Sequence, residues 1–149
     1  MSDGNVRLSG SPRTYCGNVL KLGFPVVGVV DLDRAVAFWT SGLDLVATTE
    51  WQSEEWVTLA YADGSGRALG LQRSNSPVQA RPRMHLDLLA DSVDEQVAEV
   101  ARLVGLGAVR TDWDAYPPDP DFVVLADPEG NLFCVIDLSH APSGDHPAS

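Results

Sequence analysis

Basic residues are scarce in this sequence. Its 149 residues include 10 Lys and Arg against 21 Asp and Glu, which gives a formal net charge of −11. A surface of this sign repels phosphate backbones and anionic lipid headgroups, so the composition argues against nucleic-acid binding. Long apolar runs are missing too. No stretch of about 18 apolar residues occurs, so we expect no membrane-spanning segment.

Cysteine is equally rare. The two residues, Cys16 and Cys134, lie far apart, and no Cys-x-x-Cys pair is present. We therefore expect free thiols in a reducing compartment. The opening residues, Met1 to Asn5, lack a basic start followed by an apolar stretch, so no secretory leader is visible and a cytoplasmic location is expected.

Regular structure is expected to be lacking at both ends of the chain. Residues 1–21 are rich in Gly, Ser, Asn and Pro, and residues 140–149 resemble them, so an N-terminal arm and a C-terminal tail are predicted. His140 and His146 fall in this tail and are expected to be solvated. The remainder, residues 22–139, is long enough for one domain with a hydrophobic core.

Within this domain the chain repeats itself with a spacing near sixty residues. The first unit opens with an apolar strand, Phe24–Val30, followed by a helix over Arg34–Ser41. Asp33 is the expected N-cap of this helix, and Gly42 is expected to end it. Three extended pieces complete the unit: Leu45–Trp51, Trp56–Ala62 and Ala68–Gln72, with a turn at Asp63–Gly66.

The second unit has the same order. Its strand, Arg83–Leu89, precedes a helix that begins with a capping box, Ser92 and Glu95, and ends at Gly105. The residues predicted to form the buried stripe of this helix are Val93, Val97, Val100, Ala101 and Val104. The extended pieces are Ala108–Thr111, Phe122–Ala126 and Leu132–Leu138, and Asp127–Gly130 is typical of a type I turn.

A βαβββ order that occurs twice predicts an α+β protein built from two tandem modules, residues 22–74 and 83–139. The alternative is that an ordinary α+β domain contains two strand–helix pairs by chance.

The strand Arg83–Leu89 alternates strictly between polar and apolar residues. Met84, Leu86 and Leu88 share one face, which we expect to be buried under helices. His85 and Asp87 share the other, about 6–7 Å apart. Three interpretations of His85 stay open: a structural histidine bonded to Asp87, a ligand partner or general base, and a metal ligand.

Two stretches carry a family resemblance, Val29–Trp39 and Asp127–Phe133, and His85–Leu88 looks like the opening strand of the family's second module. With them the chain resembles the vicinal oxygen chelate superfamily, in its glyoxalase-like branch. The superfamily includes glyoxalase I, extradiol dioxygenases, and bleomycin- and fosfomycin-resistance proteins. The resemblance implies that the two modules curl into one mixed sheet with a cup-shaped cavity and helices on the outer face. It also implies a homodimer.

In this superfamily the cup often holds a divalent metal bound by one residue from each of four strands. Carried onto this sequence, the four places read Phe24, then Leu71 or Gln72, then His85, and finally Cys134. Only His85 matches the usual pattern, so no metal cofactor is expected. The alternative is a Zn, Ni, Mn or Fe ion held by Gln72, His85 and Cys134.

Aromatic and apolar residues are expected to fill the cup instead. The predicted ligand-binding residues are Phe24, Trp51, Trp56, Leu71, Gln72, His85, Trp113, Tyr116, Phe122 and Cys134. For each ring, the alternative is an ordinary place in the core or at a dimer interface. The Pro-rich segment Thr111–Asp121 is expected to be either a partial lid or a solvated loop.

Three functions follow from these observations. The first is a small-molecule-binding protein whose cup takes an apolar or aromatic ligand without the usual metal. The second is a metal-dependent lyase, isomerase or dioxygenase of glyoxalase type. The third is a metal-free enzyme in which His85 and Asp87 act as acid and base. The sequence therefore leaves open whether the protein is an enzyme.

Overall fold

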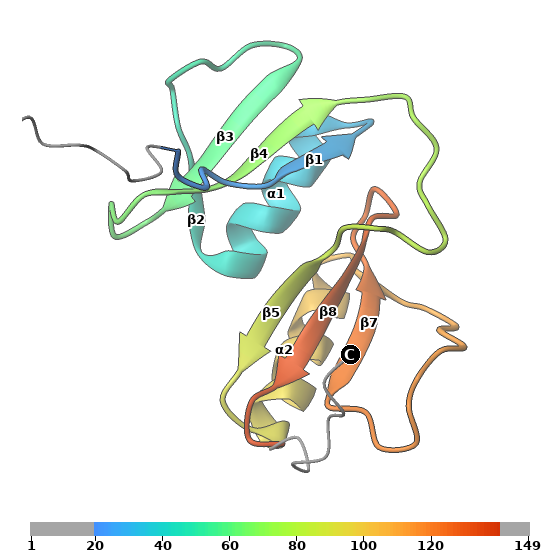
Figure 1. Cartoon of the computed structure of the whole chain (residues 1–149). Coiled ribbons are helices and arrows are strands. Elements are labelled where there is room, and N and C mark those ends of the chain that lie inside the picture. The colour runs from blue at the N-terminus through green and yellow to red at the C-terminus, as the bar shows by residue number, and fades with distance from the viewer. Residues whose placement is uncertain (1–19, 141–149) are drawn as a thin grey trace, which may run out of the picture.

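The computed structural model describes residues 20–140. Its elements follow the predicted order, βαβββ twice (Figure 1). The first module contains β1 (Val26–Val29), α1 (Leu32–Leu43), β2 (Leu45–Ala47), β3 (Trp56–Tyr61) and β4 (Arg67–Arg73). The second contains β5 (Leu86–Ala90), α2 (Val93–Gly105), β6 (Val109–Arg110), β7 (Phe122–Ala126) and β8 (Leu132–Asp137). The predicted α+β class and tandem modules are confirmed. Cys16 and His146 lie outside the described residues.

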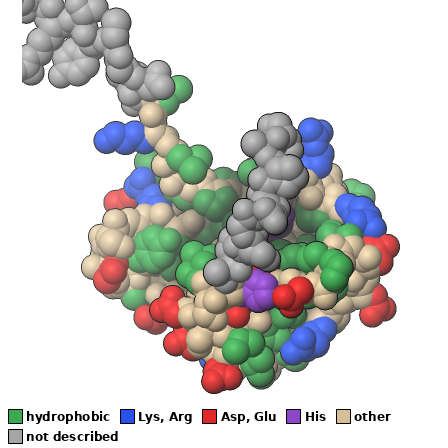
Figure 2. Space-filling model, turned by 60° about the horizontal axis from the view of Figure 1, so that its bottom comes forward, with side chains coloured by type: hydrophobic (Ala, Val, Ile, Leu, Met, Phe, Trp, Pro, Cys, Tyr) green, Lys and Arg blue, Asp and Glu red, His purple; other side chains and the backbone are tan. Residues whose placement is uncertain are grey.

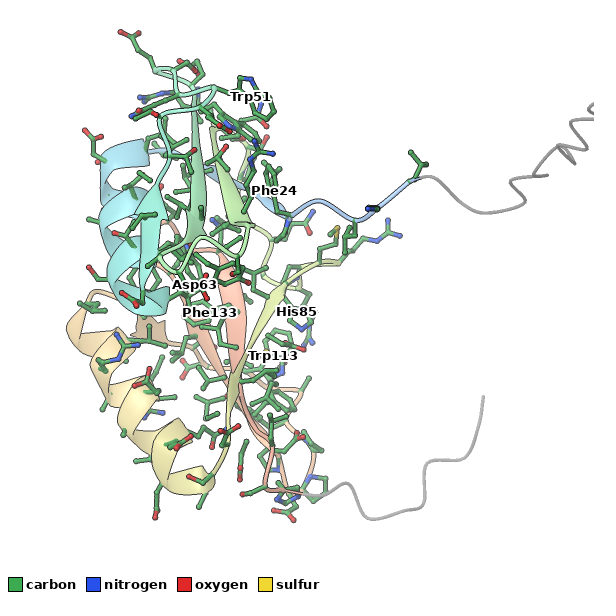
Figure 3. All side chains as sticks on the ribbon, turned by 90° about the vertical axis from the view of Figure 1, so that its left-hand side faces the viewer. Phe24, Trp51, Asp63, His85, Trp113 and Phe133 are labelled. Carbon is green, nitrogen blue, oxygen red and sulfur yellow. The ribbon has the colours of Figure 1, made fainter. Side chains whose placement is uncertain are left out.

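Each module forms its own four-stranded mixed sheet. The strand orders are β1-β4-β3-β2 and β5-β8-β7-β6, with one parallel pair in each, β1 with β4 and β5 with β8. Both helices cover the same side of the two sheets, and the opposite side is left open (Figure 3). No helix within residues 20–140 is long and apolar enough to cross a membrane.

The first helix begins and ends at other residues than predicted. Its N-cap is Asp31, which has an extended backbone and accepts a hydrogen bond from the Arg34 N–H at 3.0 Å, whereas Asp33 already lies in the first turn. The helix continues through Gly42. Asp44 ends it in the left-handed conformation, with φ 52°, which Asp tolerates better than most residues.

The second helix is capped as predicted. Ser92 accepts a hydrogen bond from the Glu95 N–H, and the Glu95 carboxylate accepts one from the Asp91 N–H. Its buried face, however, differs from the predicted stripe, because Val93, Val97, Ala101 and Val104 are exposed. The buried face consists of Gln96, Val100 and Leu103.

Gln96 explains the difference. Its amide donates hydrogen bonds to the carbonyls of Asp121 and Val135, so a polar side chain occupies the buried face at no cost in unmet hydrogen bonds.

Several strands are shorter than predicted, β2 and β5 among them. β2 ends at Ala47 instead of Trp51, because the chain leaves the sheet and Trp51 takes a positive φ of 57°. β5 begins at Leu86, so His85 lies just before the strand. Met84 is 84% exposed, which contradicts the expectation that it is buried with Leu86 and Leu88.

The core joins the two modules. Trp39 of α1 and Phe133 of β8 are both 1% exposed, and their rings lie 5.3 Å apart. The turn before β8 then holds the start of α1: the Glu129 carboxylate accepts hydrogen bonds from the N–H groups of Val30 and Asp31 and from Arg34 Nε. At the other end of α1, Arg102 donates to the carbonyls of Ser41 and Gly42. These contacts fix the modules relative to each other.

Candidate functional site

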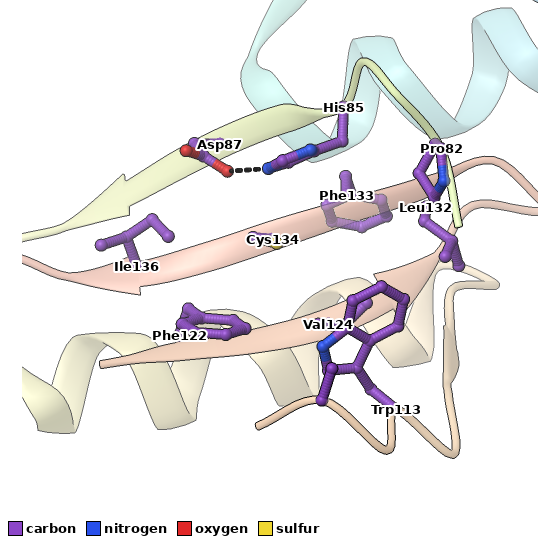
Figure 4. A pocket seen from close by; sticks show the side chains of 11 residues that line it. Pro82, His85, Asp87, Trp113, Phe122, Val124, Leu132, Phe133, Cys134 and Ile136 are labelled. Carbon is purple, nitrogen blue, oxygen red and sulfur yellow. Dashed lines mark ion pairs between the residues drawn. The ribbon is translucent and has the colours of Figure 1, made fainter. Parts of the chain in front are cut away.

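The open face of the second module carries a cavity of about 320 Å³ (Figure 4). Its lining comes from β5, β7 and β8 and from the segments that precede β5 and β7. The lining residues are Pro82, His85, Asp87, Trp113, Ala115, Phe122, Val124, Leu132, Phe133, Cys134 and Ile136. Most are apolar or aromatic, with His85 and Asp87 as the polar exception.

Strand pairing places the key side chains together. Asp87 of β5 lies beside Cys134 of β8 in the parallel pair, and Cys134 lies opposite Val124 of β7 in the antiparallel pair. Because side chains alternate along a strand, residues two positions away, such as Phe122 and Ile136, share the same face. The intervening residues, including Phe133, belong to the core, where Phe133 packs against Trp39 of α1.

The polar wall of the cavity is a group of three residues. His85 Nε2 lies 3.1 Å from Asp87 Oδ1. The donor atoms of His85, Asp87 and Cys134 all lie within 4.8 Å of one another. The His85 and Asp87 side chains are about half exposed, whereas Cys134 is buried. The cavity therefore presents an imidazole and a carboxylate above a buried thiol.

The thiol is held in its protonated form. Burial, the nearby charge of Asp87 and a hydrogen bond to it together raise the pKa of Cys134 to about 11. Since the thiolate is the reactive species, Cys134 is not an activated nucleophile at neutral pH.

Trp113 borders the cavity from the loop between β6 and β7. The Arg81 guanidinium lies 5.3 Å from the centre of its ring and pairs with Asp114 at 2.5 Å. Further along the loop, the Tyr116 ring lies 5.3 Å from Phe122, and its hydroxyl accepts a hydrogen bond from the Val124 N–H. The segment predicted as a lid or a solvated loop thus contributes Trp113 and Ala115 to the lining.

The predicted site residues of the first module lie elsewhere. Phe24 and Trp56 pack over Gly70, where an added Cβ would meet the two rings at 3.0 and 2.9 Å. Trp51 is 71% exposed, with the Arg67 guanidinium 4.7 Å from its ring centre. Figure 3 shows Phe24 and Trp51 toward one end of the open face and His85 and Trp113 toward the other.

Leu71 and Gln72 are also outside the cavity. Leu71 is completely buried in the core, and Gln72 is exposed. Neither corresponds to Cys134. In the first module, Val26 lies five residues before the helix N-cap and pairs with Gly70. In the second module, Asp87 lies five residues before the helix N-cap and pairs with Cys134. The place that matches Cys134 in the first module is therefore Gly70.

This correspondence decides how the residues fit a metal. His85 and Phe24 are equivalent, each seven residues before a helix N-cap, as are Cys134 and Gly70. Phe24 and Gly70 offer no side-chain donor, so a four-strand metal set does not fit this chain. Among residues 20–140, the His, Cys and acidic side chains that cluster closely enough to hold a metal are His85, Asp87 and Cys134.

The lining includes residues that the sequence analysis did not predict. Leu132 and Ile136 lie two residues to either side of Cys134, and Val124 lies two after Phe122, so strand alternation could have indicated them. Pro82 and Ala115 lie outside the strands, and no periodic signal marks them.

A second cavity of about 310 Å³ lies between the modules. It is lined by β1, by the linker residues 74–79 and by the start of β8, and His85 borders it as well. His140 lies apart from both, 3.4 Å from Asp119.

Comparison with known proteins agrees with this architecture. A family model described as a glyoxalase-like domain matches residues 26–136. The chain belongs to this family. Its fold is that of the vicinal oxygen chelate superfamily, to which the glyoxalase and bleomycin-resistance proteins belong. A search of curated proteins finds no match.

Several solved structures share the fold of this glyoxalase-like domain. A glyoxalase/bleomycin resistance protein/dioxygenase family enzyme from Burkholderia phytofirmans is 16% identical, with a TM-score of 0.60 over 78% of this chain and 97% of that one. A glyoxalase-related enzyme from Fulvimarina pelagi is 18% identical, with a TM-score of 0.60 over 86% and 95%. The fosfomycin resistance protein FosX from Listeria monocytogenes is 16% identical, with a TM-score of 0.60 over 80% and 91%.

Proposed function

We propose that this glyoxalase-like protein binds an apolar or aromatic small molecule in the cavity beside His85 and Asp87, without a metal ion. The observation that carries the proposal is the cavity, about 320 Å³ in volume, with a mostly apolar lining and one polar wall. Small-molecule sites usually combine an apolar concave surface with a few placed polar groups.

The aromatic lining favours a flat ligand. Trp113 and Phe122 both border the cavity, and Tyr116, which is not part of the lining, packs against Phe122. Stacking on such rings adds about 0.5–1.5 kcal/mol to the gain from burying apolar area. Arg81 and Tyr116 keep these rings in place before a ligand arrives, which lowers the entropic cost of binding.

The donor chemistry supports a cavity that works without a metal. Two of the four places that the superfamily uses for ligands are Phe24 and Gly70. The third and fourth, His85 and Cys134, include a thiol whose pKa is raised to about 11, so the form that binds metals is disfavoured.

A second candidate function is a metal-dependent lyase, isomerase or dioxygenase. It is favoured by the clustering of His85, Asp87 and Cys134, because three protein ligands and an open position suit catalytic zinc. A Zn, Ni, Mn or Fe ion bound there would act as a Lewis acid toward a chelating substrate. Titration with zinc chloride distinguishes this ligand set from the set predicted from the sequence, Gln72, His85 and Cys134. Asp87→Ala weakens zinc binding if Asp87 is a ligand, whereas Gln72→Ala weakens it if Gln72 is a ligand.

His85 and Asp87 could also serve as acid and base without a metal, as the third hypothesis states. This candidate predicts a pH–rate profile that is lost in the Asp87→Asn variant.

We also propose that the chain forms a homodimer in the cytoplasm. Val93 and Val97 on α2 and Leu89 at the end of β5 are all more than half exposed, and a partner chain would cover such apolar side chains. Light scattering on the purified full chain tests this, with the mass of a dimer expected and a monomer contradicting it.

The neutral apolar dye N-phenylnaphthylamine tests the binding function. The full chain is expected to enhance the dye's fluorescence at one site, and Ile136→Trp, which fills the cavity, is expected to abolish the enhancement. Val46→Trp on the exposed face of β2 adds the same side chain elsewhere and is the matched control. Equal enhancement by the wild type and Ile136→Trp would place dye binding outside this cavity and contradict the proposal.

A further inference from the structure

We propose that the ligand carries a cationic amine beside its apolar or aromatic body, and that Asp87 recognises the amine. This inference rests on the proposed function and narrows the class of ligand. It concerns a residue that did not belong to the ligand places implied by the family resemblance.

Asp87 is the carboxylate of the cavity wall. Among the described residues that line the cavity, no other acidic residue and no Lys or Arg is present. The Asp87 side chain is about half exposed, and its known neighbours are His85 at 3.1 Å and the buried thiol of Cys134. A carboxylate has about four acceptor sites, so two neighbours leave acceptor capacity for a ligand.

A ligand that fills the apolar part of the cavity removes water from Asp87. If the ligand offers no donor there, the carboxylate loses its hydration without compensation, which opposes binding. A protonated amine supplies both charge and donors, and hydrogen bonds to charged groups are the strong ones. The cavity therefore discriminates in favour of an amine over a neutral molecule of the same shape.

The charge around the cavity favours a cation over an anion. The Arg81 guanidinium, 5.3 Å from the ring centre of Trp113, is paired with Asp114, which offsets its positive charge. The chain also has a formal net charge of −11, and Figure 2 shows acidic side chains spread among the hydrophobic patches of one face. A field of this sign raises the local concentration of cations and repels anions.

Of the two titratable groups beside Asp87, the thiol of Cys134 and the imidazole of His85, His85 is the one that can carry a positive charge. A protonated imidazole would partly neutralise the carboxylate and weaken the preference for an amine. Binding is therefore measured at about pH 8, above the range in which histidine ordinarily carries charge.

The test compares three molecules with the same ring system: naphthylmethylamine, naphthylmethanol and naphthoate. Calorimetric titration of the full chain is expected to show that the amine binds about tenfold or more tightly than the alcohol, with the carboxylate weakest. Asp87→Asn is expected to remove the advantage of the amine and leave the affinity for the alcohol nearly unchanged. Asp94→Asn on α2, which faces away from the cavity, makes the same charge change and should leave the ranking intact.

The ranking in the wild-type protein tests the inference even if Asp87→Asn fails to fold. If the alcohol binds as tightly as the amine, the inference is overturned and the binding function stands. If Asp87→Asn keeps the amine preference, another residue recognises the amine, and the inference is equally overturned. If none of the three molecules binds, the result contradicts the proposed function itself.

Discussion

Cys134 and Asp87 lie side by side on neighbouring parallel strands, and the carboxylate raises the pKa of the thiol. The pair forms the floor and one wall of the cavity, and His85 lies beside it. In a chain that keeps few of its superfamily's metal-binding places, this contact makes Asp87 the principal polar feature of the site.

The raised pKa of Cys134 predicts slow alkylation. In a Cys16→Ser background, which leaves Cys134 as the one thiol, iodoacetamide is expected to react slowly at neutral pH and to accelerate only near the thiol pKa of about 11. Asp87→Asn removes the charge that disfavours the thiolate, so its reaction should accelerate at lower pH. Identical pH profiles for the two proteins would contradict the contact between Asp87 and Cys134.

The same shift has a consequence for stability. The unfolded thiol ionises near 9 and the folded one near 11. The protonated thiol therefore contributes its full stabilisation of the fold below pH 9, and this stabilisation is lost as the pH rises through the folded pKa of about 11. Urea unfolding is expected to show a fall in the free energy of unfolding over this range that is smaller in a Cys134→Ala variant.

Glu129 predicts a large loss of stability on truncation. Its carboxylate is 1% exposed and binds two N–H groups at the start of α1 as well as Arg34. Glu129→Ala removes the charged acceptor of these three hydrogen bonds and is expected to cost about 2–3 kcal/mol in the free energy of unfolding. Glu50→Ala, which breaks an exposed pair with Arg67, should cost under about 1 kcal/mol. Equal losses in urea unfolding would count against this role of Glu129.

Acid should weaken the same contact. Burial raises the pKa of Glu129, but hydrogen bonds from Arg34, Val30 and Asp31 outweigh burial and hold it below its usual value. The stabilisation is thus present above the ordinary carboxyl range and is lost as the pH falls through the lowered pKa. In Glu129→Ala, the free energy of unfolding should depend less on pH in this acidic range.

The space around Gly70 in the first module leaves no room for a side chain. A Cβ there would lie 2.9 Å from Trp56 and 3.0 Å from Phe24, so Gly70→Ala is expected to displace the rings and cost about 1–3 kcal/mol. Gly23→Ala, where nothing lies within 4 Å, is the control and should be nearly neutral. Dye binding should survive Gly70→Ala, because the cavity belongs to the second module. Its loss would show that the first module also shapes the site.

Arg81 is expected to hold the Trp113 ring in place. Arg81→Ala removes both the cation against the ring and the pair with Asp114, so Trp113 should gain mobility. Fluorescence anisotropy in a background with the other tryptophans replaced by Phe is expected to fall. Arg83→Ala removes the same charge two residues along the chain and should leave the anisotropy unchanged. A fall of equal size in both variants would argue against this contact.

The order of helices and strands was predicted correctly from the sequence, whereas the buried face of each element was predicted less well. Strand alternation in residues 83–89 correctly placed His85 and Asp87 on one side, and Ser92 was the true cap of α2. The buried face of α2 was predicted wrongly, because the hydrogen bonds that make Gln96 acceptable inside involve carbonyls far away in the sequence. Such partners leave no local signal.

The predictions for the site residues were also correct in part. Trp113, Phe122 and Cys134 were predicted together with His85 and Asp87, and the structure brings all five to one cavity. Leu71 was predicted beside them, but the register of β4 against β1 points it into the core and leaves Gly70 as the match to Cys134. A register difference of one residue reverses the face of every side chain, and composition alone does not fix it.

Binding of N-phenylnaphthylamine to the full chain, with and without metal, tests the central claim most directly. The protein is treated with a chelator, divided in two, and titrated with the dye before and after saturation with zinc chloride. The same dissociation constant is expected in both samples, at one site per chain. Binding that appears only after zinc is added, or no binding in either sample, would contradict a metal-free ligand cavity beside His85 and Asp87.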